Sequence, residues 1–373
     1  MTNLGRLVAE KKLLVCVGSG GVGKTTTAAS LALAGALAGR RALVLTIDPA
    51  RRLANSLGLT EIGNHEHRIQ LPPEVTGELW AMMLDAPSTF DDVIRRVAGD
   101  NATRDAIFAN RIYRSIAASF SGSQEYMATE RLYDVVRGGR YDLIVLDTPP
   151  VKNALDFLDA PGRLARFLDK QVMKRLLAPN EEDGGGFFGA KLLAGTTAVV
   201  YRLLGHIFGE EFLGDIASFF ALFRDLYDGF RERHEAVERM FADRSTSFVV
   251  VAAPTEPSME VAGFFFAELR ARGLPLGVLV VNQVHEAAHD SVDVEALLGA
   301  RVRALDPDTA GPLLARLGAA HRRLVDLAGL ERRRVDMLRR QAGAAVSVAV
   351  VPRMDGEVHD LASLAGLHRF LIG

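Results

Sequence analysis

The sequence predicts an α/β fold in which helices cover both faces of a doubly wound, mostly parallel sheet. Short apolar runs rich in β-branched residues alternate with helical patterns, and a glycine-rich turn joins the first run to the first helix. Continuous apolar runs of this length are typical of strands that are buried on both faces. The chain of 373 residues is long enough to bury a large core without disulfides.

The predicted strands follow the apolar runs in chain order. They are Leu13–Val17, Ala42–Ile47, Leu143–Leu146, Phe248–Ala253, Leu276–Val281 and Val346–Val351, with Leu79–Leu84 as a further candidate. The pattern Thr25–Gly39 predicts a helix directly after the first strand, which gives a strand–loop–helix–strand unit.

The middle of the chain has a different pattern and predicts a helical insertion over residues 154–243. Apolar residues recur at helical spacing from Leu164 to Leu176, and an aromatic stripe runs from Phe212 to Phe230. This stripe fits either core packing or a groove for an apolar partner. We therefore expect one domain formed by residues 1–153 and 244–373, which the insertion interrupts.

Composition excludes several classes of protein. The 44 basic and 46 acidic side chains nearly cancel, so no general attraction to nucleic acid or anionic lipid is expected. The single cysteine, Cys16, cannot form a disulfide within the chain or a cysteine-rich metal site. No stretch reads as a signal peptide or a membrane span, which predicts a cytoplasmic protein.

The segment Gly18–Thr25 fits the phosphate-binding pattern G-x-x-x-x-G-K-[ST] between a strand and a helix. Its glycines let backbone N–H groups point at phosphate oxygens, and the start of the helix favours the negative charge. Lys24 is predicted to meet the β- and γ-phosphates, and Thr25 to bind Mg²⁺. The predicted nucleotide-binding residues here are Gly18, Ser19, Gly20, Gly21, Val22, Gly23, Lys24, Thr25 and Thr26.

Two aspartates end predicted strands. Asp147 follows Leu143–Leu146, and Asp48 follows Ala42–Ile47. The carboxyl ends of parallel strands form the ligand-binding edge of such sheets, so both are candidate Mg²⁺ ligands beside the phosphate loop. The alternative for each is a carboxylate that caps a helix or a turn.

Three other patterns have a simpler structural explanation. His285 and His289 match the H-E-x-x-H zinc motif, but they follow a strand almost directly and lack the helix that the motif needs. The basic run Glu331–Arg340 predicts a solvated helix face, with a DNA-contacting patch as the alternative. The apolar spacing of Leu361–Leu371 predicts a C-terminal helix docked on the sheet, with a membrane-binding helix as the alternative.

The motifs together resemble the ArsA family of ATPases, which includes relatives of the arsenite pump and of the guided-entry ATPase for tail-anchored proteins. The wider group contains MinD, ParA and the nitrogenase iron protein. The resemblance extends over nearly the whole chain and rests on the segments Gly18–Thr27, Thr46–Leu59, Gly122–Ala128, Asp147–Pro161, Val280–Val284 and Val351–Val358.

This resemblance implies a P-loop fold with ATP and Mg²⁺ as ligands. Asp48 would begin switch I and Asp147 switch II, Asn282 would contact the adenine, and Pro352 would lie beside it. Lys24, Asp48 and Asn55 would be the catalytic residues. The insertion would correspond to the region that forms a client-binding groove in the tail-anchored targeting ATPases.

The chain also departs from the family at functional positions. Ser19 replaces a lysine that reaches across a dimer to the partner's nucleotide in relatives. Asn55 replaces the aspartate that activates water there, and an amide can orient water but cannot take its proton. The zinc-binding and arsenite-binding cysteines have no counterpart, so neither of these sites is expected.

The resemblance therefore implies a Mg²⁺-dependent ATPase whose nucleotide state switches a dimer between binding and releasing a partner, with an apolar helix as one candidate client. One alternative is a catalytically weak subunit whose paralogous partner supplies the missing lysine. Another is a positioning ATPase of the ParA or MinD type, acting on membrane or DNA. No nucleic-acid partner is expected under the first two interpretations.

Overall fold

The computed structural model describes the chain except residues 1–2, 48–51, 60–61, 86–88, 90, 93, 96–97, 99, 112, 114–122, 150–226, 287–292, 306–307, 355, 357 and 373. The chain divides into two compact units. The first comprises Met1–Met83, Arg140–Val151 and Phe241–Gly373, and the second comprises Leu84–Gly139 and Lys152–Met240.

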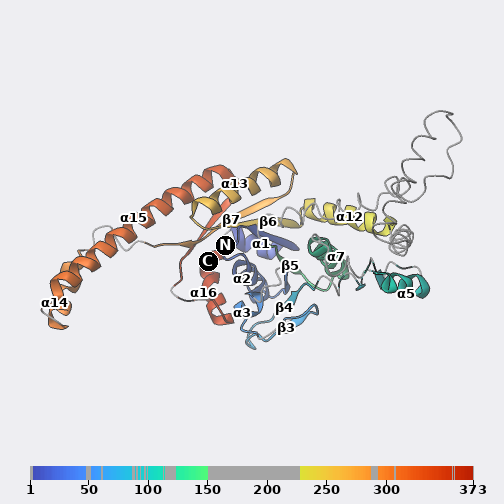
Figure 1. Cartoon of the computed structure of the whole chain (residues 1–373), viewed down its shortest axis with the longest axis horizontal. Helices are drawn as coiled ribbons and strands as arrows, with labels where there is room; N and C mark the ends of the chain where they lie inside the picture. The colour runs from blue at the N-terminus through green and yellow to red at the C-terminus, as the bar shows by residue number, and fades with distance from the viewer. Residues whose placement is uncertain are drawn as a thin grey trace, which may run out of the picture. The chain divides into compact units, whose positions relative to one another are not determined.

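The first unit contains an eight-stranded sheet in the order β3-β4-β2-β5-β1-β6-β7-β8 (Figure 1). All neighbouring pairs are parallel except β3 with β4, which confirms the predicted α/β fold. Only β3, three residues at the edge of the sheet, was not predicted. The strands are β1 (Leu13–Gly18), β2 (Arg41–Thr46), β3 (His67–Ile69), β4 (Glu78–Met83), β5 (Leu143–Asp147), β6 (Thr246–Ala252), β7 (Leu276–Val284) and β8 (Ser347–Pro352).

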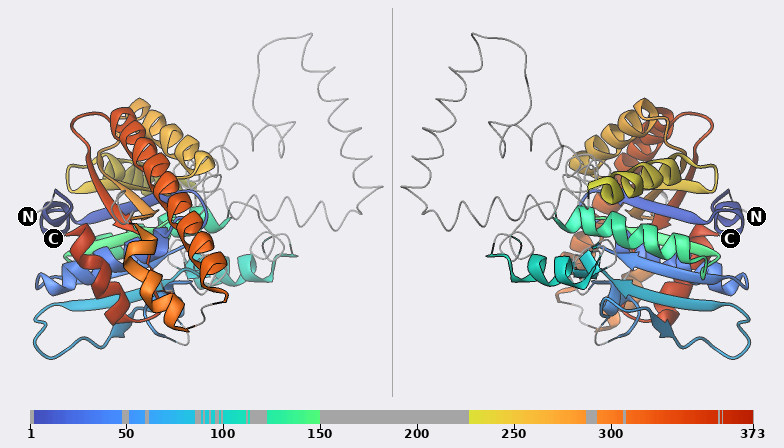
Figure 2. Two further views of the ribbon diagram at one scale, coloured as in Figure 1. Left: turned by 90° about the vertical axis from the view of Figure 1, so that its left-hand side faces the viewer. Right: turned by 90° about the vertical axis from the view of Figure 1, so that its right-hand side faces the viewer.

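One face of this sheet is covered by α1 (Asn3–Glu10), α2 (Lys24–Leu37) and α16 (Leu361–Leu371) (Figure 2). Alternate residues of β1, such as Leu14 and Cys16, join the core on this side and have no exposed surface. The predicted helix after the first strand is thus present as α2.

The other face is covered by α13 (Glu256–Ala271), which packs on β1, β6 and β7, and by the C-terminal part of α15 (Ala310–Ala342). Phe265 and Phe248 are fully buried on α13 and β6. The shorter α14 (Val294–Leu305) packs against the N-terminal part of α15. Because both faces are covered, the central strands carry nearly continuous apolar runs, such as Leu13–Val17 of β1 and Phe248–Ala252 of β6.

The predicted C-terminal helix is α16, and its apolar residues belong to the core. Leu364, Leu367 and Leu371 are buried against the cluster that α2 forms with the sheet. The hydroxyl of Ser30 on α2 also donates a hydrogen bond of 3.4 Å to the carbonyl of Leu364. These three leucines are therefore engaged in packing, as expected for a helix docked on the sheet.

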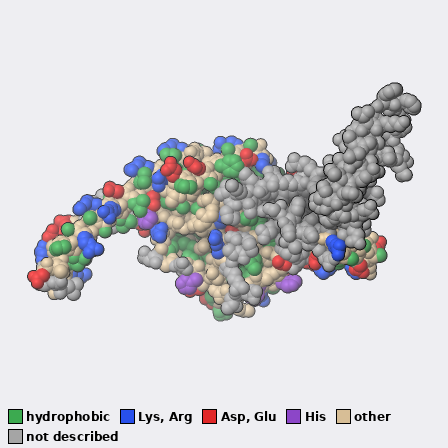
Figure 3. Space-filling view, viewed as in Figure 1, with side chains coloured by type: hydrophobic (Ala, Val, Ile, Leu, Met, Phe, Trp, Pro, Cys, Tyr) green, Lys and Arg blue, Asp and Glu red, His purple; other side chains and the backbone are tan. Residues whose placement is uncertain are grey.

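The basic run at residues 331–340 lies on α15 and has two kinds of surroundings. Val335 and Leu338 are buried, whereas Arg339 is exposed and pairs with Asp336 at 3.0 Å. Acidic and basic side chains alternate along the visible side of this helix (Figure 3). Charged side chains on one side of this part of α15 therefore face solvent, and apolar side chains on its other side are buried.

The second unit contains α5 (Asn101–Ala109), α7 (Ser123–Gly138) and most of α12 (Tyr227–Ala242). Arg233 of α12 pairs with Glu130 of α7 at 3.0 Å, and only 2% of the Glu130 side chain is exposed. The predicted stripe of residues 164–176 and the aromatic stripe up to residue 226 lie outside the described residues. Within the described parts of the chain, none of the helices has the length and apolarity needed to span a bilayer.

Candidate nucleotide site

The phosphate loop connects β1 to α2 at the centre of the sheet. Gly18 approaches the neighbouring strand so closely that a β-carbon there would lie 2.1 Å from the carbonyl oxygen of Val251. Gly21 and Gly23 have φ values of +76° and +86°, which side-chain-bearing residues rarely adopt. The spacing of the glycines therefore follows from the path that the backbone must take around a phosphate.

Lys24 is the first residue of α2, and its side chain folds back over the loop. Its Nζ donates a hydrogen bond of 2.8 Å to the carbonyl of Ser19, and only 7% of the residue is exposed. The ammonium group thus lies against the backbone of the loop, whose N–H groups are the predicted phosphate ligands. The group can therefore meet the phosphates that these N–H groups would bind.

Asp147 lies at the end of β5 and is fully buried. Its Oδ2 accepts hydrogen bonds from the hydroxyl of Thr25 at 2.7 Å and from the hydroxyl of Thr46 at 2.9 Å. Carboxylate and hydroxyl oxygens are ligands that suit Mg²⁺, which commonly takes one or two protein ligands together with phosphate and water. The donor set thus fits Mg²⁺ held between Thr25, Asp147 and a bound nucleotide.

Among the described residues, no cluster of three or more histidine, cysteine or acidic side chains could hold a metal ion by itself. His285 lies in the loop after β7, not on a helix, and both its backbone N–H and its Nδ1 interact with Glu331 of α15, at 2.7 and 2.9 Å. His289 lies outside the described residues. The described part of the H-E-x-x-H match, His285 and Glu286, is therefore not helical, whereas a zinc protease site requires a helix.

Ser19 of the phosphate loop is connected to α13. Its hydroxyl lies 3.1 Å from the hydroxyl of Ser258, and the latter accepts a hydrogen bond of 2.9 Å from the N–H of Ala253. The loop is thereby connected to the end of β6. Ser19 can stabilise the loop, but it cannot supply a positive charge.

The ends of β7 and β8 form the other side of the site. The side-chain amide of Asn282 donates to the carbonyl of Val22 at 2.9 Å, and that of Gln283 donates to the carbonyl of Gly21 at 3.1 Å. Gln283 has a φ of +62°, at the place where the register between β7 and β8 shifts. Asn282 therefore contacts the phosphate loop in this structure, and Gln283 was not predicted.

Cys16 lies on β1 beside Asp147 in the register of the sheet. Burial raises the pKa of its thiol far above the usual range, and the nearby Asp147 carboxylate adds to this effect. The thiol therefore stays protonated.

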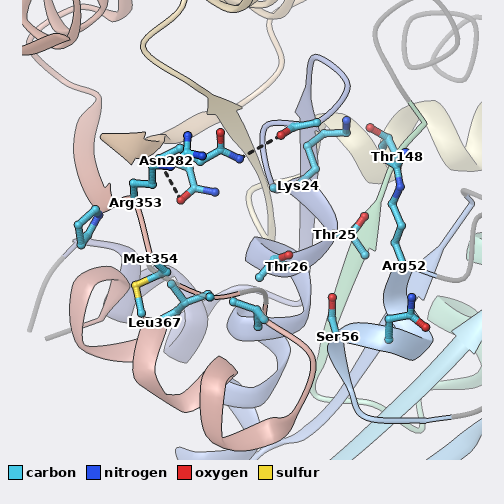
Figure 4. A pocket seen from close by; sticks show the side chains of 17 residues that line it. Lys24, Thr25, Thr26, Arg52, Ser56, Thr148, Asn282, Arg353, Met354 and Leu367 are labelled. Atoms are coloured by element: carbon cyan, nitrogen blue, oxygen red, sulfur yellow. Dashed lines mark hydrogen bonds between the residues drawn. The ribbon is translucent and has the colours of Figure 1, made fainter. Parts of the chain in front are cut away.

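These elements enclose a pocket of about 640 Å³. In Figure 4, Thr25, Arg52, Ser56 and Thr148 lie on one side of the view, and Asn282, Arg353, Met354 and Leu367 lie on the other. We call these two regions the phosphate end and the base end. The volume lies in the usual range for pockets that bind small molecules.

Most of the predicted site residues meet at this pocket, but not all. The predicted residues that line it are Gly21, Gly23, Lys24, Thr25, Thr26, Asn55, Asn282 and Pro352. Asp147 lies behind Thr25, and Gly18, Ser19, Gly20 and Val22 belong to the loop without lining the pocket. Asp48 lies outside the described residues. The lining residues that sequence reasoning missed are Arg52, Ser56, Thr148, Gln283, Arg353, Met354, Gly356, Val358 and Leu367.

The chain is also similar to known proteins. Residues 11–183 match the ArsA ATPase family, described as anion-transporting ATPase. An uncharacterized protein of Streptomyces coelicolor is 29% identical over 274 residues, which are 73% of this chain and 62% of that protein. The chain thus matches less than two thirds of the length of this relative.

Two named ATPases are also similar. ATPase ASNA1 homolog 1 of Paramecium tetraurelia is 27% identical over 275 residues, 72% of this chain and 73% of that protein. ATPase GET3 of Podospora anserina is 25% identical over 271 residues, 72% of this chain and 71% of that protein. Together with the phosphate loop at the centre of the mostly parallel sheet, these matches of modest identity support an ArsA-family ATPase related to the GET3 ATPases.

Proposed function

We propose that the chain hydrolyses ATP in a Mg²⁺-dependent reaction, and that its nucleotide state switches a dimer between binding and releasing a partner protein. The observation that carries the proposal is the junction of Lys24 and Thr25, which line the pocket, with Asp147 behind them. The Thr25 hydroxyl donates a hydrogen bond of 2.7 Å to Asp147, and Lys24 donates one of 2.8 Å to the carbonyl of Ser19. ATP and Mg²⁺ are the ligands that this junction fits.

In the proposed reaction, water attacks the γ-phosphorus, the bond to the β–γ bridging oxygen breaks, and ADP, phosphate and a proton are released. Mg²⁺, when bound, neutralises charge on the β- and γ-phosphates. The loop N–H groups and Lys24 orient the same phosphates. Asn55 lines the pocket one turn into the helix α3 (Arg52–Ser56), where its amide can orient the water but cannot accept its proton.

The switch would operate through the segments that begin at Asp48 and Asp147. In P-loop proteins the γ-phosphate and Mg²⁺ order such segments, and hydrolysis releases them. The family resemblance supports a dimer as the responding assembly and an apolar helix as the client. The proposed client region lies in residues 154–243, of which only the part in α12 is described.

One alternative has a specific observation in its favour. Ser19 is neutral and is engaged with Ser258, so this chain lacks the charge that the family lysine provides across the dimer. A paralogous partner that keeps the lysine would then complete the site. The membrane-positioning alternative has less support, because Leu364, Leu367 and Leu371 of α16 are buried in the core.

The deciding experiment is phosphate release by the purified chain alone, with Lys24→Ala as the control. Turnover that requires Mg²⁺ and is lost in the control supports the proposal and excludes an obligate heterodimer. Mass measurement by light scattering, with ADP and with a non-hydrolysable ATP analogue, tests the dimer. An unchanged monomer in both states would contradict the proposed switch.

A further inference from the structure

Thr46 places a hydroxyl group inside an otherwise apolar part of the sheet. It is the last residue of β2, and only 1% of it is exposed. Its neighbours along the chain, Leu45 and Ile47, are equally buried. A buried hydroxyl costs free energy unless it forms hydrogen bonds, whereas a valine of the same shape would fit such a strand without that cost. The hydroxyl of Thr46 is therefore better explained by what it contacts than by packing.

This hydroxyl is directed at the Asp147 carboxylate. Thr46 and Asp147 are paired positions of the neighbouring strands β2 and β5, so their side chains leave the same face of the sheet. The Thr46 hydroxyl donates a hydrogen bond of 2.9 Å to Oδ2 of Asp147. Because β-branched side chains are restricted in their rotation about χ1, the backbone of β2 fixes the direction of this hydroxyl.

The same carboxylate oxygen also accepts the hydrogen bond of 2.7 Å from the hydroxyl of Thr25. The two donors come from different elements, Thr25 from α2 and Thr46 from β2. A carboxylate oxygen has two lone pairs, and two donors make use of both. Rotation of the carboxylate would break at least one of these bonds. Thr46 thus holds the carboxylate in place against the hydroxyl that is predicted to bind Mg²⁺.

The contact also joins the starts of the two predicted switch segments. The strand β2 ends at Thr46, just before the segment that begins at Asp48, and Asp147 begins the other segment. The backbone adds a second bond, because the N–H of Ile47 donates to the carbonyl of Asp147 at 3.1 Å. Thr46 and Ile47 therefore hold Asp147 at the point where the chain leaves the sheet.

We propose that Thr46 is a positioning residue for Mg²⁺, whose hydroxyl keeps the Asp147 carboxylate in the orientation that the metal ion requires. The inference rests on the proposed function and deepens it. Removal of a group that hydrogen-bonds to a metal ligand typically lowers metal affinity or activity by about 10–100-fold. Thr46 is not among the residues that line the pocket, so it acts through Asp147 rather than on the nucleotide.

The test is a calorimetric titration of Mg²⁺ into the protein with a non-hydrolysable ATP analogue fully bound. It compares wild type with Thr46→Val, which keeps the shape of the side chain and removes the hydroxyl. Mg²⁺ affinity should fall about tenfold in Thr46→Val, whereas affinity for the analogue without Mg²⁺ should stay within about twofold. Thr46→Ser keeps a hydroxyl and should bind Mg²⁺ more tightly than Thr46→Val.

Two controls separate positioning from a general structural effect. Thr246→Val changes another fully buried threonine, at the first residue of β6 and so at the opposite end of the strands, and should leave Mg²⁺ affinity unchanged. Adding Thr46→Val to Asp147→Asn should cause no further loss of Mg²⁺ affinity, because residues that act as one unit are not additive. Thermal unfolding without nucleotide checks that each variant is folded.

Equal Mg²⁺ affinity of wild type and Thr46→Val would overturn the inference and leave the proposed ATPase intact. An equal loss of analogue affinity with and without Mg²⁺ would also overturn it, since the effect would then not depend on the metal. If the wild type binds the analogue but no Mg²⁺, the inference and the proposed metal dependence fail together. If the wild type binds both but never hydrolyses ATP, only the proposed function fails, and the Mg²⁺ affinity of Thr46→Val still decides the inference.

Discussion

The two ends of the pocket are built on different principles. At the phosphate end, Arg52 is exposed, but the loop glycines, Lys24 at 7% exposure and the fully buried Asp147 behind Thr25 are fixed by backbone geometry and packing. The base end is made of side chains at the ends of β7 and β8 and on α16, among them the exposed Arg353 and Met354. We therefore expect changes at the phosphate end to be far more costly than changes at the base end.

The largest effect is expected from Asp147→Asn. The amide keeps the shape of the side chain but removes the charge that Mg²⁺ needs, so Mg²⁺-dependent hydrolysis should fall about 10²–10³-fold. Phosphate release measured over a Mg²⁺ titration checks this. Asp142→Asn, at the exposed pair with Arg41, is the control and should leave hydrolysis unchanged. Equal activity of wild type and Asp147→Asn would refute the assigned metal site.

A smaller effect is expected from Gly23→Ala, which affects both ends at once. The new β-carbon would lie 2.2 Å from Nδ2 of Asn282 and would force this side chain away from the loop. Nucleotide affinity, measured by calorimetry, should fall about tenfold, corresponding to about 1.4 kcal/mol. The matched control is Gly21→Ala, which has a similar φ of +76° but no atom within 4 Å of the new carbon. If both variants bind nucleotide equally well, Asn282 does not hold the loop.

At the base end, Gln283→Gly should have a modest effect. Glycine adopts the left-handed backbone at φ +62° without the strain of about 1 kcal/mol that a side chain adds there, which stabilises the variant. The substitution also removes the hydrogen bond from the Gln283 side chain to Gly21, which destabilises the loop. The two changes oppose each other, so nucleotide affinity should change by less than about threefold. Thermal unfolding without ADP measures the change in stability, and thermal unfolding with ADP measures the change in nucleotide affinity. A tenfold loss of affinity would show that the base end is as sensitive as the phosphate end.

The smallest effect is expected at Cys16, beneath the phosphate end. Since burial raises the pKa of this thiol, it stays protonated across the pH range in which the protein is handled. Thiol reagents should not react with the native protein between about pH 7 and pH 9, and hydrolysis should be insensitive to them. One thiol per chain should react after denaturation in guanidinium. Rapid reaction in the native state would mean that this end of the sheet opens.

The contrast between the two ends also explains what the sequence could predict. The phosphate loop and the buried strands depend on neighbouring residues, so Gly18, Lys24, Asp147 and most of the sheet could be identified from local patterns. The base end depends on contacts between segments far apart in sequence. The contact between Gln283 and Gly21 joins residues 262 positions apart, and no local pattern indicates it. The position of Arg52 in the pocket lining likewise depends on the tertiary packing of Leu53 and Leu57, which no local pattern indicates.

The most direct test of the central claim is a calorimetric titration of the purified chain with a non-hydrolysable ATP analogue, with and without Mg²⁺. We predict one nucleotide bound per chain, tighter with Mg²⁺, and a loss of binding of at least tenfold in Lys24→Ala. Equally tight binding by Lys24→Ala, or no binding by the wild type, would contradict the assignment of this pocket as the nucleotide site.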